Sequence, residues 1–147
     1  MKINIIEDPA LAEAEITVRC PAMTGELREI VAALSLAGNT VAGICGGETH
    51  FVPLGTVLYF ESVDDRVFFY TSDGTYETPA KLYQIEEKLA CTSFVRISKS
   101  TIVNLRKVMR MRREPNARLL VTLTTGEALV VSRQYMPGIK EKLGVLL

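Results

Sequence analysis

The sequence is poor in the residues that many enzymes use for catalysis. It holds a single histidine, His50, and three widely spaced cysteines among 147 residues. Without a second histidine or a paired Cys/His arrangement, most acyl-transfer machinery is missing. The glycine patterns GxGxxG and GxxxxGK[ST] are also absent, which argues against the common dinucleotide and nucleotide sites. We therefore predict that the chain is not an enzyme and has no catalytic residue, no cofactor and no small-molecule substrate.

The cysteines offer neither a disulfide framework nor a metal site. Cys20, Cys45 and Cys91 form no CxxC pair, and their number is odd. A structural zinc ion would need all three and His50 as ligands, at no recognisable spacing. The pattern is typical of a reducing, cytoplasmic compartment, and we expect the thiols to be buried spectators.

Long hydrophobic runs are absent as well. The longest apolar stretches, such as residues 30–34, fall far short of the roughly 20 residues that a membrane-spanning helix needs. The first ten residues lack the continuous apolar stretch of a secretion signal, so none is expected. Hydrophobic residues nevertheless make up 48% of the chain, which suits one folded domain, or one domain with a small appendage.

The spacing of the aspartates argues against a response-regulator receiver domain. Residues 1–8 resemble the first strand of such a domain, where an acidic pair binds magnesium. The phosphate-accepting aspartate should follow tens of residues later, yet no aspartate lies between Asp8 and Asp64. We interpret residues 1–8 as a terminal strand that ends in the solvated Glu7 and Asp8.

A formal net charge of zero hides an uneven distribution of charge. Residues 1–55 hold three basic and seven acidic residues, whereas residues 94–142 hold eleven basic and three acidic ones. Local charge, more than the total, decides whether a polyanion is attracted. The C-terminal half therefore suits a nucleic-acid surface, although a basic face folded against an acidic N-terminal part would have the same composition.

Residues 1–47 are expected to form a strand, a helix and a second strand. Apolar and polar residues alternate in Glu15–Cys20, as in a half-buried strand. Thr24 is placed to cap a helix that stops at Gly38-Asn39, and Thr40–Cys45 follows as a short strand. The apolar face of this helix is Leu27, Ile30, Val31 and Leu34.

After residue 48 the pattern changes to hairpins and short helices. The expected strands are Thr49–Leu54, Val57–Glu61, Arg66–Thr71, Thr75–Thr78, Phe94–Ile97, Lys107–Arg112, Arg118–Thr124 and Glu127–Val131. Thr78-Pro79 is expected to open a helix, and Ser132 to cap a last helix that Gly144 ends. Thr101–Leu105 is expected to be a single helical turn. The predicted fold class is α+β, dominated by antiparallel strands.

Two segments combine cations with small hydroxyl or amide side chains where a strand ends. The first contains Arg96, Ser98, Lys99, Ser100 and Thr101, and the second contains Ser132, Arg133 and Gln134. Such groups at a backbone turn suit phosphate oxygens and base edges. Helix capping with solvated charges explains the same residues, and their chemistry alone leaves both interpretations open.

The order of motifs over about residues 49–144 resembles the LytTR family of bacterial transcription regulators. The motifs are VLYFES (57–62), the Asp73-Gly74 turn, KLYQIEEKL (81–89), FVRISKSTIVNL (94–105), TTGEALVVSRQY (124–135) and IKEKL (139–143). The resemblance implies a LytTR-like module of antiparallel strands and short helices over residues 48–147. Residues 1–47 would then be a strand–helix–strand extension that stands in place of a receiver domain.

The family reads double-stranded DNA with loops at one edge of the module, which enter successive major grooves at paired, imperfect direct repeats. By this resemblance Arg66, Lys99 and Arg133 contact bases. Phosphate or supporting contacts are implied for Arg96, Ser98, Ser100 and Asn104, and the charge and chemistry of the sequence add Arg106, Lys107, Ser132 and Gln134. Asn104 is expected to be structural rather than base-reading. Some members carry His or Asn where this chain has Arg66 and Lys99, so the preferred bases are expected to differ.

The resemblance also implies partners. We expect a sequence-specific regulator that binds DNA as a homodimer, with residues 1–47 supplying dimer contacts or a signal-input surface. Stand-alone regulators of the family often pair with a small membrane protein that restrains them. The alternative function is a protein-interaction adaptor that keeps the module as a scaffold, and an adaptor would tolerate alanine at Arg66, Lys99 and Arg133.

Overall fold

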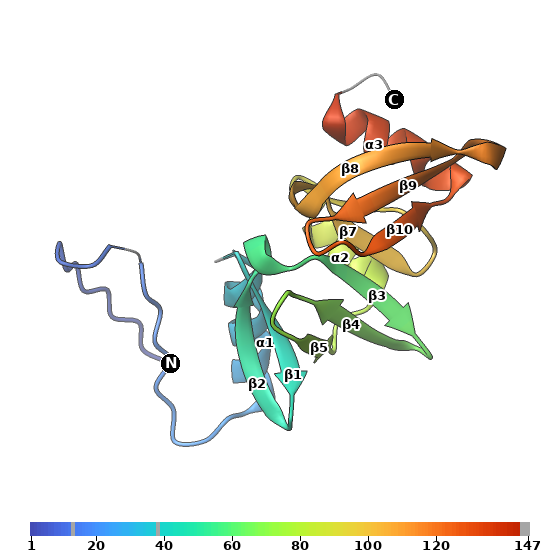
Figure 1. Cartoon of the computed structure of the whole chain (residues 1–147). Coiled ribbons are helices and arrows are strands. Elements are labelled where there is room, and N and C mark those ends of the chain that lie inside the picture. The colour runs from blue at the N-terminus through green and yellow to red at the C-terminus, as the bar shows by residue number, and fades with distance from the viewer. Residues whose placement is uncertain (13, 38, 145–147) are drawn as a thin grey trace.

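The computed structural model describes residues 1–12, 14–37 and 39–144. Within them the chain forms two antiparallel sheets and three α-helices, which confirms the predicted β-dominated α+β fold (Figure 1). The larger sheet contains β1 Thr40–Cys45, β2 Glu48–Pro53, β3 Tyr59–Val63, β4 Arg66–Tyr70, β5 Thr75–Thr78, β6 Phe94–Arg96 and β7 Thr101–Asn104. The smaller sheet contains β8 Val108–Glu114, β9 Arg118–Leu123 and β10 Ala128–Val131. The helices are α1 Gly25–Ala37, α2 Leu82–Lys88 and α3 Met136–Leu143.

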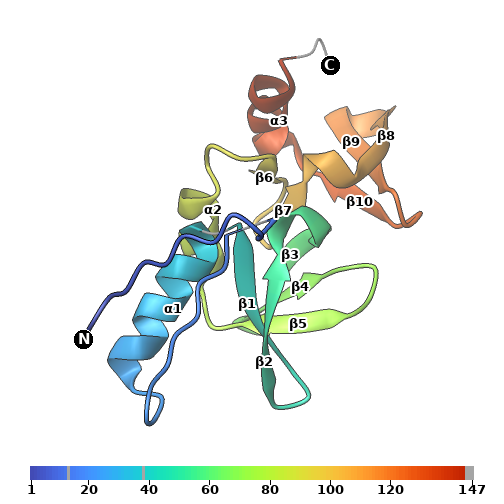
Figure 2. The same cartoon turned by 90° about the vertical axis from the view of Figure 1, so that its left-hand side faces the viewer.

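The larger sheet has the strand order β2-β1-β5-β4-β3-β7-β6, so β2 and β6 are its edges. Helix α1 packs against β1 near the β2 edge (Figure 2). The strand pairs β3–β4, β3–β7 and β6–β7 are all antiparallel. Consequently the β3–β4 turn and the β6–β7 loop lie at the same end of the sheet.

Two clusters of buried side chains hold the layers together. In the first, Leu82, Ile85 and Leu89 of the α2 region pack against Phe60 and Phe69 of the larger sheet. The second cluster joins the two sheets and α3. Its buried members are Leu58, Tyr59, Val95, Ile97, Val103, Leu119, Val121, Leu123, Val131 and Ile139. The smaller sheet and α3 are therefore fixed to the strands β3, β6 and β7.

The first 24 residues differ from the prediction. Neither residues 1–8 nor Glu15–Cys20 form a strand, although Thr24 does cap α1, its Oγ1 accepting a hydrogen bond from the Leu27 amide at 3.3 Å. A strand is stable only when another strand pairs with it. The described part of the chain provides no such partner for these segments.

The structure corrects three further predictions of local structure. Thr101–Asn104 is strand β7 and not a helical turn, because β3 and β6 pair with it on both sides. Helix α2 begins at Leu82 rather than near Thr78, because Thr78 still pairs with Val67 in the sheet. The last helix begins at Met136 after a 3₁₀ turn over Arg133–Tyr135, and the side chain of Ser132 does not cap it.

Several predicted turns are confirmed. Thr71 and Gly74 close the hairpin turn between β4 and β5, the Thr71 amide donating to the Gly74 carbonyl at 2.9 Å. Gly144 ends α3 with a φ of 58°, the left-handed conformation that favours glycine. No helix among the described residues is both long and apolar enough to cross a membrane.

Candidate nucleic-acid interface

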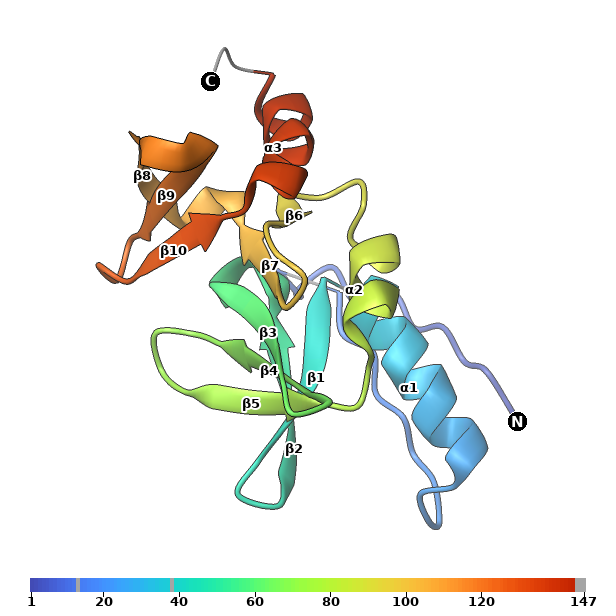
Figure 3. The same cartoon turned by 90° about the vertical axis from the view of Figure 1, so that its right-hand side faces the viewer.

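Three segments far apart in sequence meet at one end of the larger sheet: residues 63–66, residues 97–101 and residues 131–134. We call this region the loop end (Figure 3). The Ser62 amide donates to the Ser100 carbonyl at 2.8 Å, which ties the end of β3 to the β6–β7 loop. The Ser132 amide donates to the Ile97 carbonyl at 3.0 Å, which ties the turn before α3 to the same loop.

Lys99 lies at the exposed tip of the β6–β7 loop, and Arg96 holds that loop in place. The Arg96 Nε donates to the Ser98 carbonyl at 2.8 Å, and its Nη2 donates to the Lys99 carbonyl. Its Nη1 binds the Glu86 carboxylate of α2 at 2.7 Å. The side chain of Arg96 is only 19% exposed. It therefore acts from beneath the loop, while the Lys99 side chain is left at the surface.

The hydroxyl side chains of this loop also bind one another. The Ser98 Oγ accepts a hydrogen bond from the Ser100 amide at 3.2 Å and lies 3.4 Å from the Ser100 Oγ. Ser98 is half-buried, whereas Ser100 is exposed. The two hydroxyls therefore shape the turn, and Ser100 remains accessible to a phosphate oxygen.

Arg133 and Gln134 are exposed on the 3₁₀ turn that follows β10. An Arg133 Nη2 group donates to the carbonyl of Asn116, in the turn between β8 and β9, at 3.3 Å. The neighbouring Ser132 is anchored to Ile97 through both its amide and its hydroxyl. The smaller sheet therefore supports Arg133 from one side and the β6–β7 loop supports it from the other.

Arg66 is exposed at the start of β4, but its guanidinium is already engaged. It forms two hydrogen bonds with the Glu77 carboxylate, at 2.9 and 2.6 Å, and it lies over the ring of Phe68. These bonds raise the pKa of Arg66 and lower the pKa of Glu77. Two of its five N–H groups are therefore already used, so a contact from Arg66 to a base must use the remaining ones or displace Glu77.

Asn104 is buried, as its expected structural role requires. Its amide nitrogen donates to the Val57 carbonyl at 2.9 Å, and its oxygen accepts from the Ser93 hydroxyl and the Arg106 amide. At 1% exposure it has no surface to offer a ligand. Its side chain therefore ties the C-terminal end of β7 to the segments around Val57, Ser93 and Arg106.

Arg106 and Lys107 lie at that far end of β7, away from the loop end. The Thr124 amide donates to the Lys107 carbonyl, so both cations lie near the β9–β10 turn. Four residues of strand β7 separate them from the β6–β7 loop, a distance of about 13 Å at roughly 3.3 Å per residue. The structure therefore groups Lys99, Arg133 and Arg66, but not Arg106 and Lys107.

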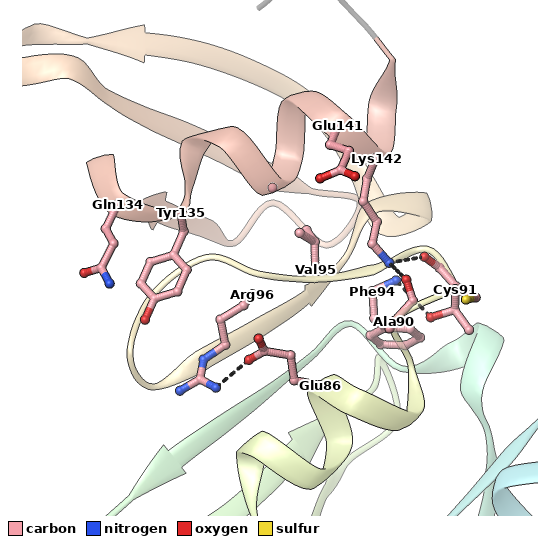
Figure 4. Close-up of a pocket in the computed structure, with 12 residues that line it drawn as sticks. Glu86, Ala90, Cys91, Phe94, Val95, Arg96, Gln134, Tyr135, Glu141 and Lys142 are labelled. Atoms are coloured by element: carbon pink, nitrogen blue, oxygen red, sulfur yellow. Dashed lines mark hydrogen bonds and ion pairs between the residues drawn. The ribbon is translucent and has the colours of Figure 1, made fainter.

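A groove of about 550 Å³ runs behind the loop end, between α2, β6 and α3 (Figure 4). Arg96 and Glu86 form part of its wall. At its other end the Lys142 ammonium donates to the carbonyls of Ala90 and Thr92, at 2.7 and 2.6 Å. Burial lowers the pKa of Lys142. These contacts fasten α3 to the end of α2.

Two tyrosine hydroxyls are bound within the fold, and that of Tyr59 links the larger sheet to the turn before β10. Tyr59 donates its hydroxyl to Glu127 at 2.7 Å, and Tyr70 donates to Glu61 at 3.1 Å. Their rings stack with centroids 4.6 Å apart. Burial, with the nearby carboxylates, raises the pKa of both hydroxyls, so both tyrosines stay neutral at ordinary pH.

The cysteines are not buried, contrary to the prediction. Cys20, Cys45 and Cys91 are all exposed, because they lie in the N-terminal segment, at the β1–β2 turn and just after α2. Within the described residues no group of three His, Cys, Asp or Glu side chains is placed to hold a metal ion.

The sequence did not identify the acidic partners Glu77 and Glu86. For Glu77 a signal was available. The predicted turn at residues 72–74 sets a register that places Phe68 opposite Glu77, and Arg66 lies on the same face as Phe68. For Glu86 the sequence held no such signal, because Glu86 lies on α2 and reaches Arg96 on β6 only through the packing of the helix on the sheet.

Comparison with known proteins gives a family match. A family model described as the LytTr DNA-binding domain matches residues 47–144. The chain belongs to the LytTR family. The resemblance found in its motifs is thereby confirmed, and residues 47–144 carry the DNA-binding domain of the family.

Full-length relatives and a solved structure match as well. Proteins named uncharacterized HTH-type transcriptional regulators, from Staphylococcus aureus strains MSSA476 and NCTC 8325, are each 29% identical to this LytTR chain, covering 99% of both chains. The LytTr DNA-binding domain of a putative methyl-accepting/DNA response regulator from Bacillus cereus has the same fold, with a TM-score of 0.69 at 24% identity. That match covers 73% of this chain and 98% of the other.

Proposed function

We propose that this chain is a transcriptional regulator that binds double-stranded DNA sequence-specifically, reading paired, imperfect repeats with its loop end in the major groove. The observation that carries the proposal is the meeting of the β6–β7 loop and the turn before α3, which places Lys99 and Arg133 on one exposed surface. None of the ion pairs found among the described residues involves either cation.

The chemistry of the loop end suits a base-reading surface. Arginine and lysine both donate to guanine O6 and N7 in the major groove. The exposed Ser100 hydroxyl and Gln134 amide beside them are suitable donors to phosphate oxygens. Arg66 is the third proposed base contact, through the N–H groups that Glu77 does not use or after DNA displaces Glu77.

The remaining basic residues have a different proposed role. Arg106 and Lys107, at the far end of β7, attract DNA phosphates without regard to sequence. Each phosphate that a cation neutralises steepens the fall of log affinity with log salt by about 0.9. The two classes of residue are therefore separable by experiment.

The test is fluorescence anisotropy of the full chain on DNA from upstream of its own gene, against a scrambled duplex, over a range of salt concentrations. Lys99→Ala and Arg133→Ala should each lose discrimination worth about 1–3 kcal/mol, or roughly 5- to 150-fold. Arg106→Ala is the matched control. It should weaken binding to both duplexes alike and leave their ratio unchanged.

Equal binding of the wild-type chain to both duplexes, lost at moderate salt, would refute the proposal. An unchanged ratio in both Lys99→Ala and Arg133→Ala would refute the assigned contacts. That second result favours the adaptor function, because an adaptor tolerates alanine at these positions.

A further inference from the structure

The N-terminal segment, residues 1–24, exposes far more apolar surface than a folded monomer normally does. Every described residue of this segment is exposed. Its large apolar side chains are between 41% and 90% exposed, namely Met1, Ile3, Ile5, Ile6, Leu11, Ile16, Val18 and Met23. Eight large apolar side chains left exposed on one segment are a reason to look for a surface that covers them.

The middle of this segment has the pattern of a strand without a partner strand. Ile16 and Val18 alternate with polar residues in Glu15–Cys20, so one face of an extended chain is apolar. These six residues form no ladder in the described structure. Residues 15–20 therefore have the pattern of a strand that can pair with the open edge of a sheet.

An open sheet edge that could pair with such a strand is present on the same chain. Strand β2 is an edge of the larger sheet and, among the described strands, pairs only with β1, so its outer edge is open to a further strand. Phe51 on β2 is 52% exposed, and Ile44 on β1 is 44% exposed. Next to β1, a groove of about 340 Å³ with a largely apolar lining opens toward α2.

We propose that a second copy of this chain covers both surfaces, with residues 15–20 of each copy pairing with strand β2 of the other. A chain that carries both a free strand and a free edge forms a closed, two-fold dimer by reciprocal exchange. The need for two copies rests on the proposed function, in which paired repeats are read together.

Size and placement support a second copy as the partner. Standard interfaces take about 20–30 residues from each side, and the N-terminal segment has 24. DNA is a poor partner for it, since residues 1–55 hold seven acidic and three basic residues. The segment and β2 lie on the opposite side of the molecule from the loop end, so a dimer formed there leaves both loop ends free (Figure 1).

The test is light scattering on the full chain in the absence of DNA, at micromolar concentration. The wild-type chain should have twice the monomer mass of 16.2 kDa. Val18→Asp, on the apolar face of the segment, should be monomeric, and so should Phe51→Asp on β2. Thr17→Asp makes the same charge change on the polar face of the segment and should remain a dimer. Circular dichroism checks that each variant is folded.

DNA binding separates this proposal from the proposed function. Val18→Asp should bind a single half-site like the wild type and lose at least tenfold on the paired site. A wild-type monomer, a dimeric Val18→Asp variant, or equal loss on both DNAs would each overturn the interface. A wild-type dimer that does not distinguish the DNA duplexes would instead refute the proposed function and leave the interface standing.

Discussion

Replacing Arg96 by lysine should weaken specific DNA binding by the loop end, although the positive charge at position 96 is kept. The guanidinium of Arg96 reaches three acceptors at once, the Ser98 and Lys99 carbonyls and the Glu86 carboxylate. A lysine ammonium is a compact point charge and cannot reproduce that fork. The variant therefore loses at least two of the three hydrogen bonds, and Lys99 is no longer held in place.

The expected loss of DNA affinity follows from the backbone order that the β6–β7 loop loses in this variant. Fixing the backbone of one residue costs about 1–2 kcal/mol, so restoring Ser98 and Lys99 on DNA binding costs roughly 2 kcal/mol or more. We therefore expect specific affinity to fall by about 30-fold in Arg96→Lys. Stability should fall less, by about 1–2 kcal/mol, because the exposed loop carbonyls regain water when the bonds are lost.

Anisotropy with specific and scrambled duplexes measures this effect, and Glu86→Gln is the matched control. Glu86 is 48% exposed, so its ion pair contributes less than about 1 kcal/mol, and its loss spares both loop carbonyls. If Arg96 instead bound a DNA phosphate directly, lysine would substitute well. Wild-type affinity in Arg96→Lys would therefore refute the positioning role.

Three further variants test other parts of the molecule. Glu77→Gln should free Arg66, raise DNA affinity several-fold and steepen the salt dependence by up to about 0.9; unchanged binding would remove Arg66 from the interface. Because the pKa of Glu77 is lowered, this ion pair persists above the ordinary carboxylate pKa and breaks only as pH falls below it. Asn104→Ala should cost about 4 kcal/mol and lower the melting temperature by roughly 10 °C, since three hydrogen bonds are lost in a buried site; a shift under about 3 °C would contradict this. Gly43→Ala should cost about 1–3 kcal/mol in chemical denaturation, because a Cβ there meets the fully buried ring of Phe69, and a neutral result would contradict that packing.

The local structure predicted from sequence was right where neighbouring residues decide it. The turn at Asp73-Gly74, the cap at Thr24 and the stop at Gly144 all depend on short-range chemistry, and all are present. The predictions failed where distant strands decide the outcome. Thr101–Asn104 is a strand because β3 and β6 flank it, a fact that no local pattern contains.

The candidate site was predicted from motifs more than from physics. The resemblance to the LytTR family singled out Lys99 and Arg133, which the fold places on one surface. It grouped Arg96, which lies beneath the loop, with exposed residues such as Ser100. Exposure and hydrogen-bond partners depend on how the chain packs, and no local sequence pattern contains that packing.

The loop end depends on Thr101–Asn104 being a strand rather than the predicted helical turn. A loop that led into a single helical turn would hold Lys99 from one side only, whereas paired strands on both sides, with Arg96 beneath, hold it from three. On the proposed function, Lys99 binds DNA from a preordered loop and loses little conformational freedom, while Arg66 shares its guanidinium with Glu77. Discrimination should accordingly depend most on the base pairs that face the β6–β7 loop, and least on those that face β4.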